Sequence, residues 1–298
     1  MFILNLIRGF CMALADSVPG VSGGTIAFLL GFYEKFIVSL DHLMTGKKEE
    51  RIEAIKFLFK IGIGWVIGMV SSMLVLGSIF ESHIYQISSL FLGFILFSIP
   101  IIILEEKEEF KGKYKNLIFT VIGIALVVTI SLLNPASGEG QSMNLQSLNF
   151  GTGIYVFLVA MVAISAMILP GISGSTLLLI FGLYIPVVTA VKELLHFNLS
   201  YLPVVMVFAL GCLIGIATVI KLIKKCLEKY KSQTMYTILG LMLGSIAPII
   251  LGPTTLDVPQ SAMSFGTFSV IFFIIGGVII LGLQKLKAVM SKKEEENK

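Results

Sequence analysis

The sequence is short of charged residues. Only 13% of its 298 residues are Asp, Glu, Lys or Arg, whereas 56% are hydrophobic and the mean hydropathy is +0.96. This composition excludes an ordinary soluble domain and is typical of a protein that crosses a membrane several times. The net charge of +4 is too small to indicate a nucleic-acid partner.

Cysteine and histidine are also scarce, with three of each. Cys11, Cys212 and Cys226 lack metal-ligand spacing and are interpreted as small buried side chains. We therefore predict neither a metal site nor another cofactor. The apolar start of the chain runs into Asp16 rather than a small-residue cleavage site, so no cleavable signal peptide is expected.

What the sequence does contain is a set of helix-breaking residues that occurs twice within apolar sequence. The first copy is Asp16-Ser17-Val18-Pro19-Gly20-Val21-Ser22-Gly23-Gly24-Thr25, and the second is Pro170-Gly171-Ile172-Ser173-Gly174-Ser175-Thr176. In hydrocarbon, a broken backbone is tolerated only where protein or a cavity satisfies the freed groups. Two related breaks in a membrane chain are a usual sign of a substrate site.

The apolar runs predict an all-α polytopic membrane protein. The runs on either side of the first break are each shorter than the roughly 20 residues that a crossing helix needs, so a re-entrant hairpin is expected. Repeat one, residues 1–134, would comprise a hairpin at 2–40 and spans at 57–80, 84–104 and 116–133. Repeat two, residues 150–287, would comprise a hairpin at 152–191 and spans at 202–220, 234–251 and 267–283. Residues 288–298 would form a charged tail.

The repeat extends beyond the breaks, because Gly64 and Gly93 match Gly211 and Gly240. A hairpin contributes an even number of crossings and three spans an odd number, so the second repeat would be inverted relative to the first. Counting each hairpin as two full spans would leave the loops on the same sides, and residues 152–169 are long enough for a full crossing.

The distribution of charge gives an independent prediction of topology. Nearly every Lys and Arg lies in 41–56, 105–115, 221–231, the tail or the first hairpin, whereas 134–149 and 252–266 have none. The positive-inside rule then places both termini in the cytoplasm. The first hairpin would open inward and the second outward.

The breaks offer groups that suit an anion. Glycines allow close approach to the backbone, and helix N-termini present N–H donors and partial positive charge. Two such tips would form one central phosphate pocket. The candidate residues are Arg8, Ser17, Gly20, Ser22, Gly23, Gly24, Thr25, Gly171, Ser173, Gly174, Ser175 and Thr176. The alternative is that the small residues only allow tight helix packing.

Two ionisable residues of the first hairpin are costly at membrane depth. We interpret Asp16 as the site of a coupling proton or monovalent cation, and Arg8 as a contact for an anionic head. Asp16 becomes Met167 in the second repeat, so the fold does not require the carboxylate twice. Asp16 could instead cap nearby N–H groups, and Arg8 could extend to cytoplasmic headgroups.

At Ala15–Ile37, and again at Ile168–Tyr184, the sequence resembles the PopT family of bacterial polyprenyl-phosphate transporters. The resemblance covers nearly the whole chain. It implies a non-enzymatic, multi-pass protein of the bacterial plasma membrane that returns undecaprenyl phosphate, the lipid carrier of cell-wall synthesis, from the outer to the inner leaflet. The implied partners are this lipid and the membrane around it. The oligomeric state is left open.

Two alternatives remain at this stage. Membrane phosphatases that act on undecaprenyl pyrophosphate also use inverted re-entrant hairpins, but Gly23 and Gly174 stand where their loop has an Arg. No paired Glu accompanies Asp16, and diphosphate cleavage would want a cation clamp and a metal or base. The third candidate is a transporter of small anions, which the hairpins alone do not exclude.

Overall fold

The computed structural model describes residues 2–17, 22–72, 82–133, 149–255 and 259–296. Within these ranges the chain forms helices and no β-strand, which confirms the all-α prediction. The α-helices are α1 (Phe2–Asp16), α2 (Gly23–Leu29), α3 (Tyr33–Thr45), α4 (Lys48–Ser71), α6 (Ile84–Glu105), α7 (Lys107–Phe110), α8 (Leu117–Leu133), α9 (Phe150–Ile168), α10 (Gly174–Ile180), α11 (Tyr184–Leu195), α12 (Leu202–Lys229), α13 (Lys231–Gly244), α14 (Ile246–Leu251) and α15 (Val270–Glu296).

Among the described residues, six helical segments are long and apolar enough to cross a membrane, so the chain is a multi-pass membrane protein. They are Lys48–Ser71, Ile84–Glu105, Tyr114–Leu133, Phe150–Ile168, Leu199–Lys229 and Lys231–Thr254. Four of the predicted spans fall within these segments. The segment Phe150–Ile168 corresponds to the first arm of the second predicted hairpin. This arm is long enough to cross the membrane by itself.

Two predicted spans have different bounds in the structure. The span predicted at 57–80 begins earlier, at Lys48, and residues 73–80 lie outside the described part of the chain. The span predicted at 267–283 begins at Val270, and its helix continues to Glu296 through most of the predicted tail.

The charged segment 41–56 is mostly helical rather than a loop. Helix α3 continues to Thr45, and α4 starts at Lys48, where the backbone N–H of Lys47 donates to Oε2 of Glu50 at 2.8 Å. The basic segment 221–231 is likewise mostly the end of α12. Lys, Arg and Glu are good helix formers, so these helices do not end where the apolar sequence ends.

The second arm of each predicted hairpin is two helices rather than one. Gly31 ends α2 with φ 65° and Gly182 ends α10 with φ 66°. In both arms the residue after this glycine donates its N–H to the carbonyl five positions back, at 3.0 and 2.8 Å. This is the Schellman arrangement, in which glycine supplies the left-handed conformation. The axes of α10 and α11 consequently differ by 106°.

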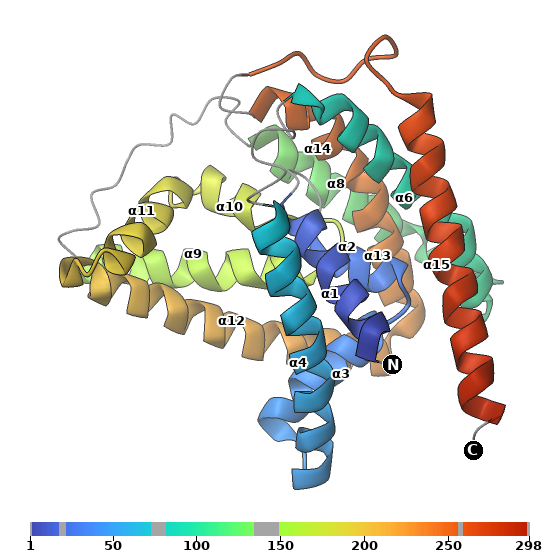
Figure 1. The fold of residues 1–298 in the computed structure, drawn as a ribbon, viewed down its shortest axis with the longest axis horizontal. Coiled ribbons are helices and arrows are strands. Elements are labelled where there is room, and N and C mark those ends of the chain that lie inside the picture. Colours follow the sequence, from blue (N-terminus) through green and yellow to red (C-terminus); the bar gives the residue numbers. More distant parts are fainter. Residues whose placement is uncertain (1, 18–21, 73–81, 134–148, 256–258, 297–298) are drawn as a thin grey trace.

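Equivalent glycines bring helices together in the two halves of the chain. Helix α1 packs on α4, and α9 packs on α12. Figure 1 shows α9 and α12 side by side. A Cβ added to Gly64 would overlap the carbonyl oxygen of Leu6, and one added to Gly211 would lie 2.5 Å from that of Phe157. The glycine one turn further along each helix makes the matching contact.

The remaining long helices exchange partners between the halves. Helix α6 packs on α15, visible along one side of Figure 1, and α13 packs on α8. A Cβ added to Gly93 would overlap the carbonyl of Phe273, and one added to Gly240 would overlap that of Thr120. The repeat in sequence is thus accompanied by a repeat of helix contacts.

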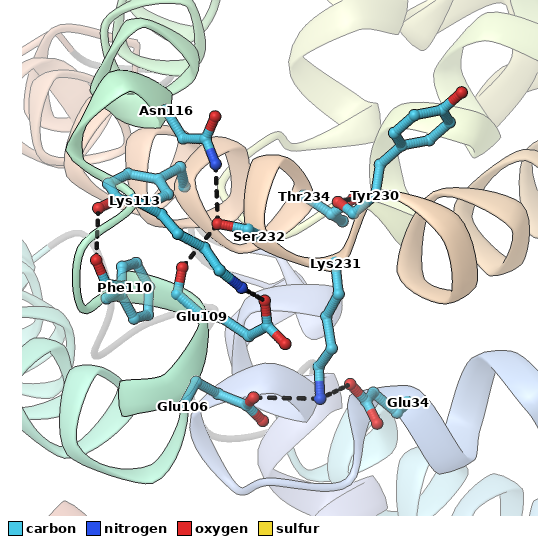
Figure 2. Close-up of polar contacts among 11 residues, drawn as sticks. Glu34, Glu106, Glu109, Phe110, Lys113, Asn116, Tyr230, Lys231, Ser232 and Thr234 are labelled. Carbon is cyan, nitrogen blue, oxygen red and sulfur yellow. Dashed lines mark hydrogen bonds and ion pairs between the residues drawn. The ribbon is translucent and has the colours of Figure 1, made fainter.

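A cluster of polar contacts joins the start of α13 to the first half of the chain (Figure 2). Nζ of Lys231 lies 3.1 Å from Oε2 of Glu106 and 3.5 Å from Oε1 of Glu34. Oγ of Ser232 donates to the carbonyl of Glu109 at 2.6 Å and accepts from Nδ2 of Asn116 at 2.8 Å. These contacts fix the end of α13 against α3 and α6–α7.

A second ion pair joins α3 to α12. Oδ2 of Asp41, which is 4% exposed, lies 2.6 Å from Nζ of Lys224 and accepts from the Thr45 hydroxyl at 3.0 Å. Burial acts to raise the pKa of Asp41, but the hydrogen bonds from Lys224 and Thr45 outweigh it and hold the pKa below its ordinary value.

Candidate functional site

The two breaks lie against each other. The backbone N–H of Gly171 donates to Oγ1 of Thr25 at 2.8 Å, and Oγ of Ser22 donates to the carbonyl of Leu169 at 3.3 Å. A Cβ added to Gly24 would lie 2.5 Å from the carbonyl oxygen of Ile168, so only glycine fits there. The structure therefore brings Ser22, Gly24, Thr25 and Gly171 together. Gly20 lies outside the described residues.

The other candidates of the second break form a separate group. The hydroxyls of Ser173 and Ser175 lie 2.8 Å apart, and Ser173 and Thr176 are buried. A Cβ added to Gly174 would lie 2.8 Å from the carbonyl oxygen of Ala163, so this glycine packs on α9. In the conformation observed, the hydroxyls of Ser22, Thr25, Ser173 and Ser175 bind one another or the facing backbone.

The helix that begins at the first break is shorter than expected. The sequence suggested an arm of about 15 residues, but α2 has seven. Its N–H groups are partly engaged, because Gly23 donates to Oδ1 of Asp16 at 2.7 Å and Thr25 donates to Oγ of Ser22 at 3.2 Å. Fewer peptide dipoles are aligned in α2 than in the predicted arm, so the partial positive charge at its N-terminus is smaller than the sequence suggested.

The side chain of Asp16 is held by two donors on different elements. One oxygen accepts from Gly23, as described, and the other accepts from Nε1 of Trp65 on α4 at 2.9 Å. The capping role considered for Asp16 is thus present, although at Gly23. No sequence pattern links Trp65 with Asp16. Its indole N–H was the missed signal, because a buried Trp N–H usually finds a partner.

Asp16 also lines a cavity of about 650 Å³. Gly23 and Gly24 line it beside Asp16, and the remaining walls are almost entirely apolar. The second half of the chain contributes Ile164, Met167, Ile168 and Ile216. Three lining residues of α4 are more than half exposed at the surface, namely Phe59, Val66 and Ile67. The cavity therefore lies between the two halves and reaches the apolar surface beside α4.

Two predicted site residues, Arg8 on α1 and Ser17 directly after it, do not line this cavity. Nη1 of Arg8 donates to Oδ1 of Asn5 at 3.0 Å, and its guanidinium lies 4.8 Å from the centre of the Phe32 ring. Oγ of Ser17 donates to the carbonyl of Ala13 at 2.8 Å. Arg8 nevertheless shares one face of α1 with Asp16, since positions four apart align along a helix.

The described residues contain no group of three or more His, Cys, Asp or Glu side chains that could hold a metal ion. All three cysteines are free thiols. Among the described residues that line the cavity, the polar groups are the carboxylate of Asp16, the indole N–H of Trp65 and the backbone of Gly23 and Gly24.

Fold and site together define a multi-pass helical membrane protein whose cavity is apolar on its walls and polar at one end. The chain belongs to the undecaprenyl phosphate translocase-like family, whose model matches residues 12–267. It is 32% identical, over 96% of its length and 97% of the relative's, to a polyprenyl-phosphate transporter of Staphylococcus aureus. It is 30% identical, over 83% of its length and 77% of the relative's, to a polyprenyl-phosphate transporter of Vibrio cholerae.

No solved structure matches the chain. The relatives are named as transporters, which agrees with the prediction of a lipid-carrier transporter rather than an enzyme. The family resemblance inferred at the breaks is confirmed.

Proposed function

We propose that this protein carries undecaprenyl phosphate from the outer to the inner leaflet of the bacterial plasma membrane. The observation that supports this most is the cavity, which has Asp16 and two glycine backbones at one end and apolar walls that reach the lipid-exposed face of α4. A phosphate carried across hydrocarbon needs a polar environment, because an unpaired charge there is very unfavourable. The prenyl tail would stay in the apolar part and in the surrounding lipid.

We propose that the two halves are inverted repeats that expose the cavity alternately to each side. Gly64 and Gly211 make equivalent contacts with their facing helices, and so do Gly93 and Gly240. These equivalent contacts support a common repeat unit. The charge distribution supports the inversion and a cytoplasmic position for both termini. Transport would then proceed by rocking one half against the other around the contact between the breaks.

The phosphate would bind where the breaks meet. Separation of the halves would release the bonds of Thr25 with Gly171 and of Ser22 with Leu169, freeing two hydroxyls and an N–H for the phosphate. Ser17 and Gly20, with the second-break residues Ser173, Gly174, Ser175 and Thr176, would complete the site. Arg8, two turns from Asp16 on the same face of α1, would receive the phosphate on its way to the cytoplasm.

Asp16 is the proposed site of coupling to a proton or monovalent cation. It is the ionisable side chain among the described residues that line the cavity. The ion would enter and leave with the lipid as the cavity changes sides.

The test is a leaflet-accessibility assay with the purified protein in proteoliposomes that contain undecaprenyl phosphate. Wild-type protein should move the lipid between leaflets, and a variant lacking the hydroxyls of Ser22, Thr25, Ser173 and Thr176 should be much slower. The matched control removes the hydroxyls of Ser71 and Thr218, which bond only to the preceding turn of their own helices. Wild-type rates in the first variant would refute the pocket, and no transfer by the wild type would refute the function.

The two alternative functions fit less well. Phosphate release from undecaprenyl pyrophosphate by the purified protein would favour the phosphatase, but the relatives are named as transporters. A transporter of small anions has no need of an apolar cavity that reaches the lipid-exposed surface.

A further inference from the structure

The carboxylate of Asp16 is fixed in direction by two N–H donors, one on each oxygen. They come from Gly23, at 2.7 Å, and from Trp65, at 2.9 Å. An ionised carboxylate has about four acceptor positions. The group therefore retains acceptor capacity at the cavity that it lines.

A phosphate placed beside this carboxylate meets a group of the same charge. Among the described residues that line the cavity, none carries a positive charge. Two like charges in contact repel each other strongly where the effective dielectric constant is well below that of water. The repulsion becomes a hydrogen bond if one proton lies between the two groups. A phosphate monoester can supply this proton, because its second pKa is about 6.

We infer that Asp16 determines specificity by accepting a hydrogen bond from the protonated oxygen of a lipid phosphate monoester. Trp65 and Gly23 are positioning groups, since their N–H groups are engaged with the carboxylate and hold its direction. This inference rests on the proposed function and names its ligand class as the monoanion of a lipid phosphate monoester. Bulk phospholipids are mostly phosphodiesters, which have no P–OH group, so this contact would separate the carrier from the lipid that surrounds it.

Apart from Asp16, the ionisable groups of the described elements around the cavity do not line it. Helix α2 has none, and the tyrosine of α9 donates its hydroxyl to the carbonyl of Phe181. The cations Arg8, Lys35 and Lys60 lie over aromatic rings. Glu34 of α3 is paired with Lys231. The sulfhydryls of Cys11 on α1 and Cys212 on α12 remain, and both are neutral as thiols. The proton in question is therefore assigned to the pair formed by Asp16 and the phosphate.

The opposite wall of the cavity provides a matched control. Met167, the counterpart of Asp16 in the second half, lines the same cavity and has no ionisable group. The carboxylate is therefore present on one side only, and a substitution of Met167 changes the wall without changing the proposed contact.

The protein supplies its own spectroscopic probe, because Trp65 is its one tryptophan. Farnesyl phosphate and its monomethyl ester would be titrated into the full chain in lipid nanodiscs, with Trp65 emission and calorimetry as readouts. The affinity for farnesyl phosphate should fall about 50-fold between pH 6 and pH 8, because the monoanion fraction falls that far for a pKa of about 6. The monomethyl ester should bind more weakly and without this dependence on pH.

Three variants measured by calorimetry complete the test. Asp16→Asn should bind both ligands with little dependence on pH, because its amide can donate as well as accept. Trp65→Phe keeps a ring but loses the donor, and should show a shallower pH profile. Met167→Leu should keep the steep slope. Equal binding of both ligands to the wild type, or a steep profile in Asp16→Asn, would overturn the inference while leaving the proposed function intact. No binding of farnesyl phosphate at any pH would count against both.

Discussion

The hydrogen bond between Thr25 and Gly171 gives the sharpest prediction about the contact between the two halves. Thr25→Val replaces the hydroxyl by a methyl group of similar size, so the buried N–H of Gly171 loses its acceptor. A buried donor left unpaired costs about 1–3 kcal/mol. We expect the free energy of unfolding to fall by that amount and the thermal midpoint to fall by a few degrees.

The second half of the chain offers the control. Thr176 matches Thr25 in the repeat and is also buried, but it is Thr25 that accepts the hydrogen bond from Gly171 across the two breaks. The assay is thermal or denaturant unfolding in detergent of Thr25→Val, Thr25→Ser and Thr176→Val. Thr25→Ser should stay near the wild type, because serine keeps the acceptor. A wild-type midpoint for Thr25→Val, or an equal loss for Thr176→Val, would show that this bond does not hold the halves together.

Two further predictions concern packing and charge. Gly64→Ala and Gly211→Ala should each destabilise the protein by about 1–3 kcal/mol in unfolding assays, because their new methyl groups meet the backbone of the facing helix. Gly62→Ala, where nothing lies within 4 Å, should be neutral or stabilising. Equal effects at all three sites would contradict the repeat of contacts. The lowered pKa of Asp41 means that its pair with Lys224 stabilises the fold above the ordinary pKa of about 4 and is lost as pH falls through the lowered value. The acid midpoint of unfolding should therefore move in Asp41→Asn, and an unchanged pH profile would contradict this assignment.

Much of the fold follows from the sequence because hydrocarbon imposes simple rules on it. Apolar runs of sufficient length had to be helices, and four predicted spans fall within observed ones. The ends were less predictable, since Lys48 and its charged neighbours form a helix as readily as apolar residues do. The breaks at Gly31 and Gly182 were visible as matching glycines, but the apolar sequence around them suggested a continuous arm.

The candidate site was predictable in part. The duplicated breaks identified the residues that meet, but not that Thr25 and Gly171 bond to each other, because sequence does not give distances between segments far apart in the chain. The partner of Asp16 was missed for the same reason. Trp65 lies 49 positions away, and only the packing of α1 on α4 brings its indole to the carboxylate.

The most direct test of the account is a cryo-EM map of the protein in nanodiscs with undecaprenyl phosphate. The account predicts that the two breaks enter from opposite faces of the bilayer, with the phosphate between them at hydrogen-bonding distance from Asp16 and the tail emerging beside α4. A phosphate bound away from the breaks, or two breaks that enter from the same leaflet, would contradict it.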